Sequence, residues 1–276
     1  MTSWKFAMKK QILERILIKI LYFFFFLFVI FPFLWGFRTS LAERFETALI
    51  PTRFTLMHYK ILFARPEFLI YLKNSAVISL LTIFATLIIA LLSGYALARL
   101  KFSGQKLSGL LLILPLLPPV AILVPLVSYF QKLGLYNSIG AIVVANVVFN
   151  LPLSVWMMRN FIRGCPVALE EAALIDGCSR ISALFRIIVP AVGPGIVAVA
   201  VFVFINTWNN FLYAFALTSS QSLRVLPQGI LSFLGNWGTY WGGLTAAGIL
   251  VMIPPVIFFL IFQKWFIAGI FGQQLK

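Results

Sequence analysis

Residues 170–190, EEAALIDGCSRISALFRIIVP, decide the fold, because they are the longest interruption in a second half of the chain that otherwise consists of apolar runs. Pro166 suits the first turn of a helix, Gly177 suits a left-handed residue that stops it, and Ser179 can accept the first amides of a second helix. The pattern therefore predicts a helix, a sharp turn and another helix.

The same stretch carries charge. Glu171 and Asp176 are two of only seven acidic residues in the chain, and arginines lie on both sides of them. A short charged element between apolar runs offers a surface that a partner protein can bind.

The composition predicts an all-α membrane protein that is embedded in the lipid bilayer. Hydrophobic residues make up 62% of the 276 residues, and the mean hydropathy is +1.02, both more than a soluble core needs. The net charge of +15 does not indicate nucleic acid as a partner, because the basic residues flank apolar runs and form no stripe with interleaved aromatic residues outside them.

The apolar runs predict six transmembrane helices. An even number of spans puts both termini on one side, and the excess of lysine and arginine identifies that side as the cytoplasm. A cytoplasmic N-terminus (1–19) and tail (269–276) then enclose a transmembrane domain (20–268), whose loop 163–190 is cytoplasmic. The first apolar run is longer than the ~7–15 residues of a signal-peptide core, which favours an uncleaved span. The predicted spans are 20–37, 74–98, 108–130, 139–161, 192–217 and 244–262.

The residues needed for enzymatic chemistry are missing from the sequence. There is no glycine-rich phosphate-binding loop with a lysine, and Cys165 and Cys178 have neither metal nor redox spacing. With a single histidine, His58, we expect no catalytic residue, metal or cofactor. The predicted spans contain no Asp or Glu, which an ion-coupled secondary transporter would normally use. A stand-alone secondary transporter or channel is nevertheless the alternative function.

Asparagines in the fourth and fifth predicted spans are the candidates for a translocation path. Asn206, Asn209 and Asn210 are spaced i, i+3, i+4, which places them on one helix face with Trp208 turned away. Together with Asn150, their amides are able to satisfy sugar hydroxyls in a water-filled cavity. Asparagines also hold membrane helices together, so a purely structural role is equally open.

The central loop resembles the signature loop of permease subunits of bacterial ABC importers. Glu-Ala-Ala at 171–173 is followed after three residues by Gly177, after nine more by Ile187, and then by Val189-Pro190, where the family usually has leucine before the proline. The resemblance covers roughly residues 74–272, and further motifs are similar to the carbohydrate-uptake branch that includes the maltose-type sugar permeases. These motifs are Asn74-Ser75, ALARLKFSG at 96–104, GLYN at 134–137, Leu151-Pro152, Trp156, Thr207-Trp208-Asn209 and QKWF at 263–266.

The resemblance implies an architecture and a set of partners. It implies a type I ABC importer permease fold, multi-pass in the bacterial cytoplasmic membrane, with six transmembrane helices, both termini cytoplasmic and a cytoplasmic coupling helix. Two ATP-binding subunits would hydrolyse ATP, a second permease subunit, usually a different chain, would complete the pathway, and an extracytoplasmic solute-binding protein would deliver a sugar or related polyol.

The resemblance also assigns roles within the coupling loop. Glu171 is implied to form a salt bridge to the ATPase subunit, while Ala172 and Ala173 keep the helix slim enough to enter a cleft. Gly177 allows the turn, and Pro190 leads the chain back toward the membrane. The alternative is a solvated helix in which Asp176 pairs with Arg180. The implied coupling residues are Glu171, Ala172, Ala173, Asp176, Gly177 and Pro190.

Overall fold

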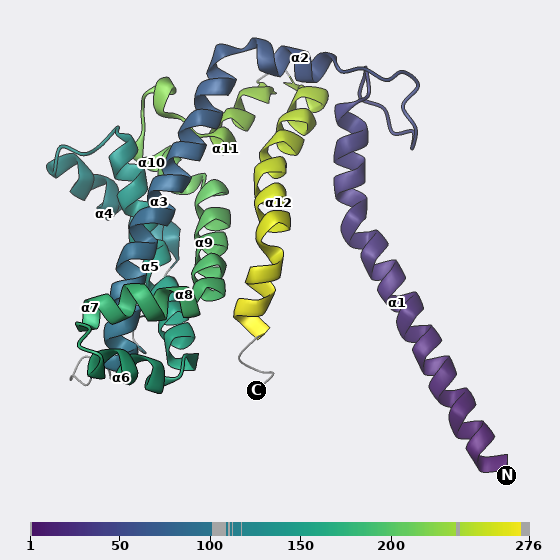
Figure 1. The fold of residues 1–276 in the computed structure, drawn as a ribbon. Coiled ribbons are helices and arrows are strands. Elements are labelled where there is room, and N and C mark those ends of the chain that lie inside the picture. Colours follow the sequence, from purple (N-terminus) through teal and green to yellow (C-terminus); the bar gives the residue numbers. More distant parts are fainter. Residues whose placement is uncertain are drawn as a thin grey trace. The chain divides into compact units, whose positions relative to one another are not determined.

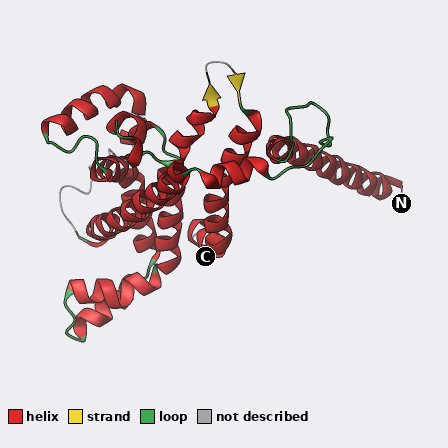
Figure 2. Ribbon diagram, turned by 90° about the horizontal axis from the view of Figure 1, so that it is seen from above, coloured by secondary structure: helices red, strands yellow, loops and turns green. Residues whose placement is uncertain are grey.

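The computed structural model describes residues 2–100, 109, 111, 113–116, 118–235 and 238–271. It divides into two compact units, Met1–Ala64 with Phe233–Leu250, and Arg65–Ser232 with Val251–Lys276. The described residues are almost entirely helical, as the composition predicts, and the only strands among them are β1 (Leu234–Gly235) and β2 (Gly238–Thr239), which form a hairpin (Figure 2).

Four helices of the described part are long and apolar enough to cross a membrane. They correspond to the first, second, fourth and sixth predicted spans, but each is longer than predicted. The segment between the first two spans, predicted to be a loop, is partly helical, because it contains α2 (Met57–Ala64) and the first turns of the next helix. The four are α1 (Thr2–Ser40), α3 (Pro66–Arg99), α5 (Ile139–Gly164) and α12 (Trp241–Phe271) (Figure 1).

The third predicted span is broken, as its prolines suggest. The described part consists of η2 (Leu114–Leu116) and α4 (Pro119–Lys132), and α4 begins where two consecutive prolines end the preceding turn. With 14 residues, α4 is shorter than the ~20 residues that a helix needs to cross the hydrocarbon core. The predicted start at Ser108 lies outside the described residues.

The fifth predicted span, 192–217, is wrong as a single helix. It divides into α9 (Gly193–Trp208) and α10 (Leu212–Leu217), with Asn209 as the C-cap of α9. Asparagine side chains compete for backbone hydrogen bonds and favour helix ends, and Asn210 Oδ1 accepts from the backbone amide of Tyr213 at 3.0 Å, at the start of α10. Two consecutive asparagines therefore end the helix.

The core of the second unit lies where α3, α5 and α9 pack side by side (Figure 1). One face of α3 carries only small side chains, Ser79, Thr82, Thr86 and Ala90, all fully buried, and then Gly94. Small residues let helix backbones approach closely. A Cβ added at Gly94 would lie 3.0 Å from the backbone nitrogen of Arg159, so α5 passes directly over this glycine.

The chain after α10 is fastened to the first turns of α3. Asn74 Nδ2 donates to the carbonyls of Ser222 and Arg224, at 2.8 and 2.9 Å, and Ser75 Oγ accepts from the amide of Leu226 at 2.8 Å. The two residues that resemble a family motif in the sequence therefore have a structural role. The elements held in this way are η4 (Gln221–Leu223) and α11 (Leu226–Gly229), and η5 (Ile230–Phe233) follows them.

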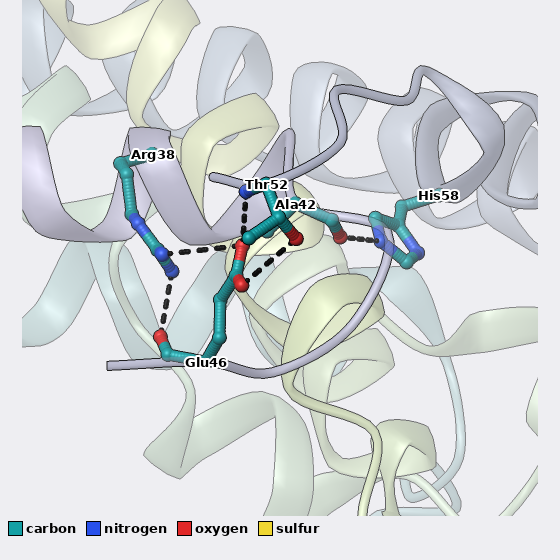
Figure 3. A network of polar contacts seen from close by, with 5 residues as sticks. All are labelled: Arg38, Ala42, Glu46, Thr52 and His58. Atoms are coloured by element: carbon teal, nitrogen blue, oxygen red, sulfur yellow. Dashed lines mark hydrogen bonds and ion pairs between the residues drawn. The ribbon is translucent and has the colours of Figure 1, made fainter. Parts of the chain in front are cut away.

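In the first unit, polar contacts close the segment that follows α1 (Figure 3). Arg38 donates to the Glu46 carbonyl at 2.8 Å and pairs with its carboxylate at 3.5 Å, while that carboxylate accepts from the amide and hydroxyl of Thr52. The buried ring of His58 donates from Nε2 to the carbonyl of Ala42 at 2.8 Å, and Nδ1 bonds the hydroxyl of Tyr240. Both nitrogens of His58 are thus engaged in structural contacts.

Candidate functional site

The central loop folds as a helix, a turn and a helix, as predicted from its sequence. The first helix, α6 (Val167–Ile175), follows Pro166 and ends in a left-handed Gly177 with φ of 85°. The amide of Gly177 donates to the carbonyl of Leu174 at 3.1 Å, and that of Cys178 to the carbonyl of Ala173 at 2.9 Å. This pair of bonds is the Schellman arrangement, which requires a residue that tolerates positive φ at this position.

The second half of the loop is helical up to the start of α9. Ser179 caps α7 (Arg180–Ala183) by accepting from the amide of Ser182 at 3.2 Å. A π-helical turn, η3 (Leu184–Ile188), and a short α8 (Val189–Ala191) follow, and this stretch meets α9 at an angle of 79°. Pro190 lies in α8, directly after the wide π turn. The chain thus turns sharply two residues after Pro190.

An exposed face of the loop combines acidic and apolar side chains. Glu171 and Asp176 are exposed, and neither forms a side-chain hydrogen bond or ion pair with another described residue. In the same loop, Ile175 is 86% exposed, Ile181 70% and Phe185 53%. Large apolar side chains exposed beside unpaired acids are typical of a surface that is covered by a partner. The alternative Asp176–Arg180 ion pair is not formed among the described contacts.

The two alanines of the loop lie on different sides of α6. Ala172 is exposed, whereas Ala173 is 4% exposed and faces inward, where α6 packs against η3. Buried Ala183, Leu184 and Ile188 lie on the inner side of the second helical segment. Small size is therefore needed at Ala173 for packing within the loop, and only Ala172 remains free to approach a partner.

Sequence reasoning missed Glu170, which is the residue with the strongest contacts in the loop. Its Oε2 lies 3.0 Å from Nε of Arg99, and its Oε1 accepts from the hydroxyl of Tyr95 at 2.5 Å. Arg99 also donates from Nη2 to the carbonyl of Cys165 at 2.7 Å. The sequence places Arg99 at the end of the second predicted span and two adjacent glutamates in the loop, but it could not show which glutamate turns inward.

The predicted asparagines meet at a cavity of about 250 Å³ in the second unit. Asn150 on α5, Asn206 on α9 and Asn210 in the break line it, but Asn209 does not. The expectation that Asn206, Asn209 and Asn210 share one helix face is therefore wrong, because α9 ends before Asn209. Among the described residues, the lining consists of Leu114, Pro115, Pro119, Phe149, Asn150, Leu153, Phe202, Asn206, Asn210 and Tyr213.

The described residues that line this cavity are uncharged, and they include both aromatic rings and polar amides. The rings of Phe149 and Tyr213 are stacked with centroids 4.6 Å apart. Asn150 donates to the carbonyl of Asn146 at 2.8 Å, and its Oδ1 accepts from Asn206 Nδ2 at 3.3 Å. Asn206 lines the cavity and is exposed, so its amide has donor and acceptor capacity left for a ligand.

Comparison with known proteins identifies the family. The model for binding-protein-dependent transport system inner membrane components matches residues 86–272. The chain belongs to this family. The match includes the coupling loop, both helices that carry the cavity asparagines, and Arg99. The protein is thus a permease subunit of an ATP-driven ABC importer in the cytoplasmic membrane, and ATP is hydrolysed by a separate ATPase subunit.

Relatives of this permease cover nearly its whole length. The trehalose/maltose transport system permease of Thermococcus litoralis is 34% identical in an alignment that covers 98% of this chain and 99% of the relative. The sulfoquinovosyl glycerol transport system permease of Agrobacterium fabrum is 34% identical and covers 90% of this chain and 89% of its own. These findings confirm the family resemblance seen in the sequence and give no support to a stand-alone secondary transporter or channel.

Solved structures share the permease fold. A chain of a bacterial ABC transporter involved in the import of the acidic polysaccharide alginate has a TM-score of 0.81 and 18% identity, and the match covers 92% of this chain and 96% of that chain. At this level of identity the likeness concerns the fold alone.

Proposed function

We propose that this permease transports an uncharged sugar or a related polyol. The observation that carries the proposal is the cavity lining, in which the amides of Asn150, Asn206 and Asn210 lie beside stacked aromatic rings and none of the described lining residues is charged. Amides both donate to and accept from hydroxyl groups, and aromatic faces pack against the apolar side of a sugar ring. The names of the relatives, which include trehalose and maltose, support the sugar class.

The proposed topology places the coupling loop in the cytoplasm, with residues 1–19 and 269–276 on the same side. Residues 20–268 then form the membrane domain, together with a second permease subunit, and the solute-binding protein delivers its ligand from outside. The excess of basic residues in the segments assigned to the cytoplasm supports this orientation. Residues 272–276 lie outside the described part.

In this arrangement the exposed face of the coupling loop binds the ATPase subunit. Glu171 and Asp176 supply negative charge, and Ile175, Ile181 and Phe185 supply apolar area. Gly177 fixes the turn between the two halves of this surface. ATP-driven closure of the ATPase pair would displace the loop and move the helices that line the cavity between inward-facing and outward-facing arrangements.

The substrate class is tested by a ligand screen on the cognate solute-binding protein. Isothermal titration with trehalose, maltose, sorbitol and sulfoquinovosyl glycerol compares neutral ligands with an anionic one. We expect a neutral sugar or polyol to bind at least about tenfold more tightly than the anionic ligand, a difference of ~1.4 kcal/mol. Exclusive binding of the anionic ligand would contradict the proposed class.

Asn206→Leu is expected to reduce uptake of the bound sugar by roughly tenfold or more, because it replaces an amide at the cavity wall with an apolar side chain that offers no hydrogen bond. Uptake is measured in proteoliposomes that contain the complete importer. Asn209→Leu is the matched control, since Asn209 neighbours the same break but does not line the cavity. Equal uptake rates and ligand preferences for Asn206→Leu and the wild type would remove Asn206 from the translocation path.

A further inference from the structure

Three elements of the second unit meet at one buried ion pair beside the coupling loop. The side chains of Arg99, at the end of α3, and Glu170, in α6, are 7% and 4% exposed and approach to 3.0 Å. Tyr95, one turn before Arg99 on α3, donates its hydroxyl to the other carboxylate oxygen at 2.5 Å. The carbonyl of Cys165, the C-cap of α5, accepts from Arg99 at 2.7 Å.

The buried ion pair links the loop to α3 by a contact that cannot be broken without leaving a charge unpaired. A buried charge that loses its partner is left without compensation, so separating α6 from α3 is strongly unfavourable. Two nitrogens of the Arg99 guanidinium are engaged at once: Nε forms the ion pair with Glu170, and Nη2 donates a hydrogen bond to the carbonyl of Cys165. A lysine has a single ammonium group and does not reproduce this fork.

Adjacent glutamates in α6 point to opposite sides. Glu171 lies on the exposed face with Ile175 and Asp176, whereas Glu170 is directed into the protein. A force applied to the exposed face by a partner therefore reaches α3 through Glu170 and Arg99. From α3 it continues through close packing to α5 and α9, which carry Asn150 and Asn206 at the cavity.

We propose that Arg99 and Glu170 are positioning residues that join the coupling helix α6 to α3 as one rigid body, with Tyr95 fixing the carboxylate. Displacement of the loop then moves α3, whereas without the pair the loop shifts on its own and ATP hydrolysis is no longer converted into transport. This inference rests on the proposed coupling role of the loop and assigns a task to residues that do not touch the ATPase subunit.

The test compares transport with ATP hydrolysis in the complete importer. Glu170→Gln, Arg99→Met and Arg99→Lys are reconstituted in proteoliposomes with both ATPase subunits, the second permease and the solute-binding protein. Radiolabelled trehalose is the probe, or the tightest neutral ligand of the titrations above if trehalose does not bind. The quantity measured is sugar transported per ATP hydrolysed, alongside the amount of ATPase subunit that co-purifies. Arg163→Met is the matched control, because Arg163 is an exposed arginine at the same end of α5.

We expect Glu170→Gln and Arg99→Met to keep the ATPase subunits bound while the transport ratio falls by roughly tenfold, within the 5–150-fold range of coupling between sites. The transport ratio of Arg99→Lys should lie between those of Arg99→Met and the wild type, and Arg163→Met should have the wild-type ratio. A wild-type ratio in Glu170→Gln and Arg99→Met would overturn the proposal, even if less complex is recovered, because a purely structural role changes the amount of complex and not the ratio.

Two further variants test the proposal if the first ones fail to assemble or lose the ATPase subunits. If Glu170→Gln does not assemble, Tyr95→Phe removes only one hydroxyl group and should lower the ratio in the same direction by a smaller factor. An unchanged ratio in Tyr95→Phe would then count against the proposal. Loss of the ATPase subunit from Glu171→Lys but not from Arg99→Lys distinguishes the docking role of the loop from the internal link.

Discussion

Glu171→Lys should abolish sugar uptake while the permease remains in the membrane at the wild-type amount. The side chain lies on the exposed face of α6 and makes no hydrogen bond or ion pair within the described part of the chain, so its replacement leaves the internal packing intact. Reversing its charge would turn the proposed attraction to a cation of the ATPase subunit into repulsion. Co-purification of the ATPase subunits and uptake in proteoliposomes both measure the effect.

The control for this variant is Glu67→Lys, which reverses an exposed acid in the first turn of α3, at the other end of that helix from Arg99. It should leave co-purification and uptake close to the wild type. Asp176→Lys shows whether the second acid of the exposed face shares the contact. Unchanged co-purification and uptake in Glu171→Lys would show that this glutamate does not couple the two subunits.

Gly94→Leu should destabilise the permease so strongly that little folded protein is recovered. A Cβ at this position already lies 3.0 Å from the backbone nitrogen of Arg159 and from two side-chain atoms of Met158. Because backbone does not yield as a flexible side chain does, leucine must push α3 and α5 apart. Overpacking of this kind costs about 1–3 kcal/mol and more where backbone has to move. Thermal unfolding in detergent and the yield of monodisperse protein measure the loss.

Gly248→Leu is the matched substitution, because a Cβ at Gly248 in α12 meets nothing within 4 Å. Both variants remove a helical glycine and add the same apolar side chain. We expect Gly248→Leu to unfold near the wild-type temperature. Equal unfolding temperatures for the two variants would contradict the close packing of α3 on α5.

The coupling loop was the part of the fold most accessible from sequence. Its turn depends on local chemistry, since Gly177 adopts positive φ and Ser179 caps the next helix, and both signals lie within a few residues of the structure that they produce. The long apolar helices follow from composition in the same way. Helix ends were less accessible, as the extension of α3 to Pro66 shows.

Contacts between distant parts of the chain were not predictable in this way. Glu170 and Glu171 are identical in type and adjacent, and only the position of Arg99 on α3 decides which of them is buried. The break after Trp208 likewise depends on Asn210 bonding the next turn instead of continuing the helix. The sequence therefore identified the right asparagines as cavity candidates, but it assigned Asn209 to the same group through a helix face that does not exist.

The most direct test of the account is sugar uptake by reconstituted importer with and without its ATPase subunits. The permease pair is reconstituted in proteoliposomes. The solute-binding protein and its tightest-binding sugar are added outside, and ATP is enclosed in the lumen, on the side of the ATPase subunits. We predict uptake only when the ATPase subunits and ATP are both present, and no change when an ionophore dissipates ion gradients. Uptake that persists without the ATPase subunits, or that stops with the ionophore, would contradict a permease driven through its coupling loop.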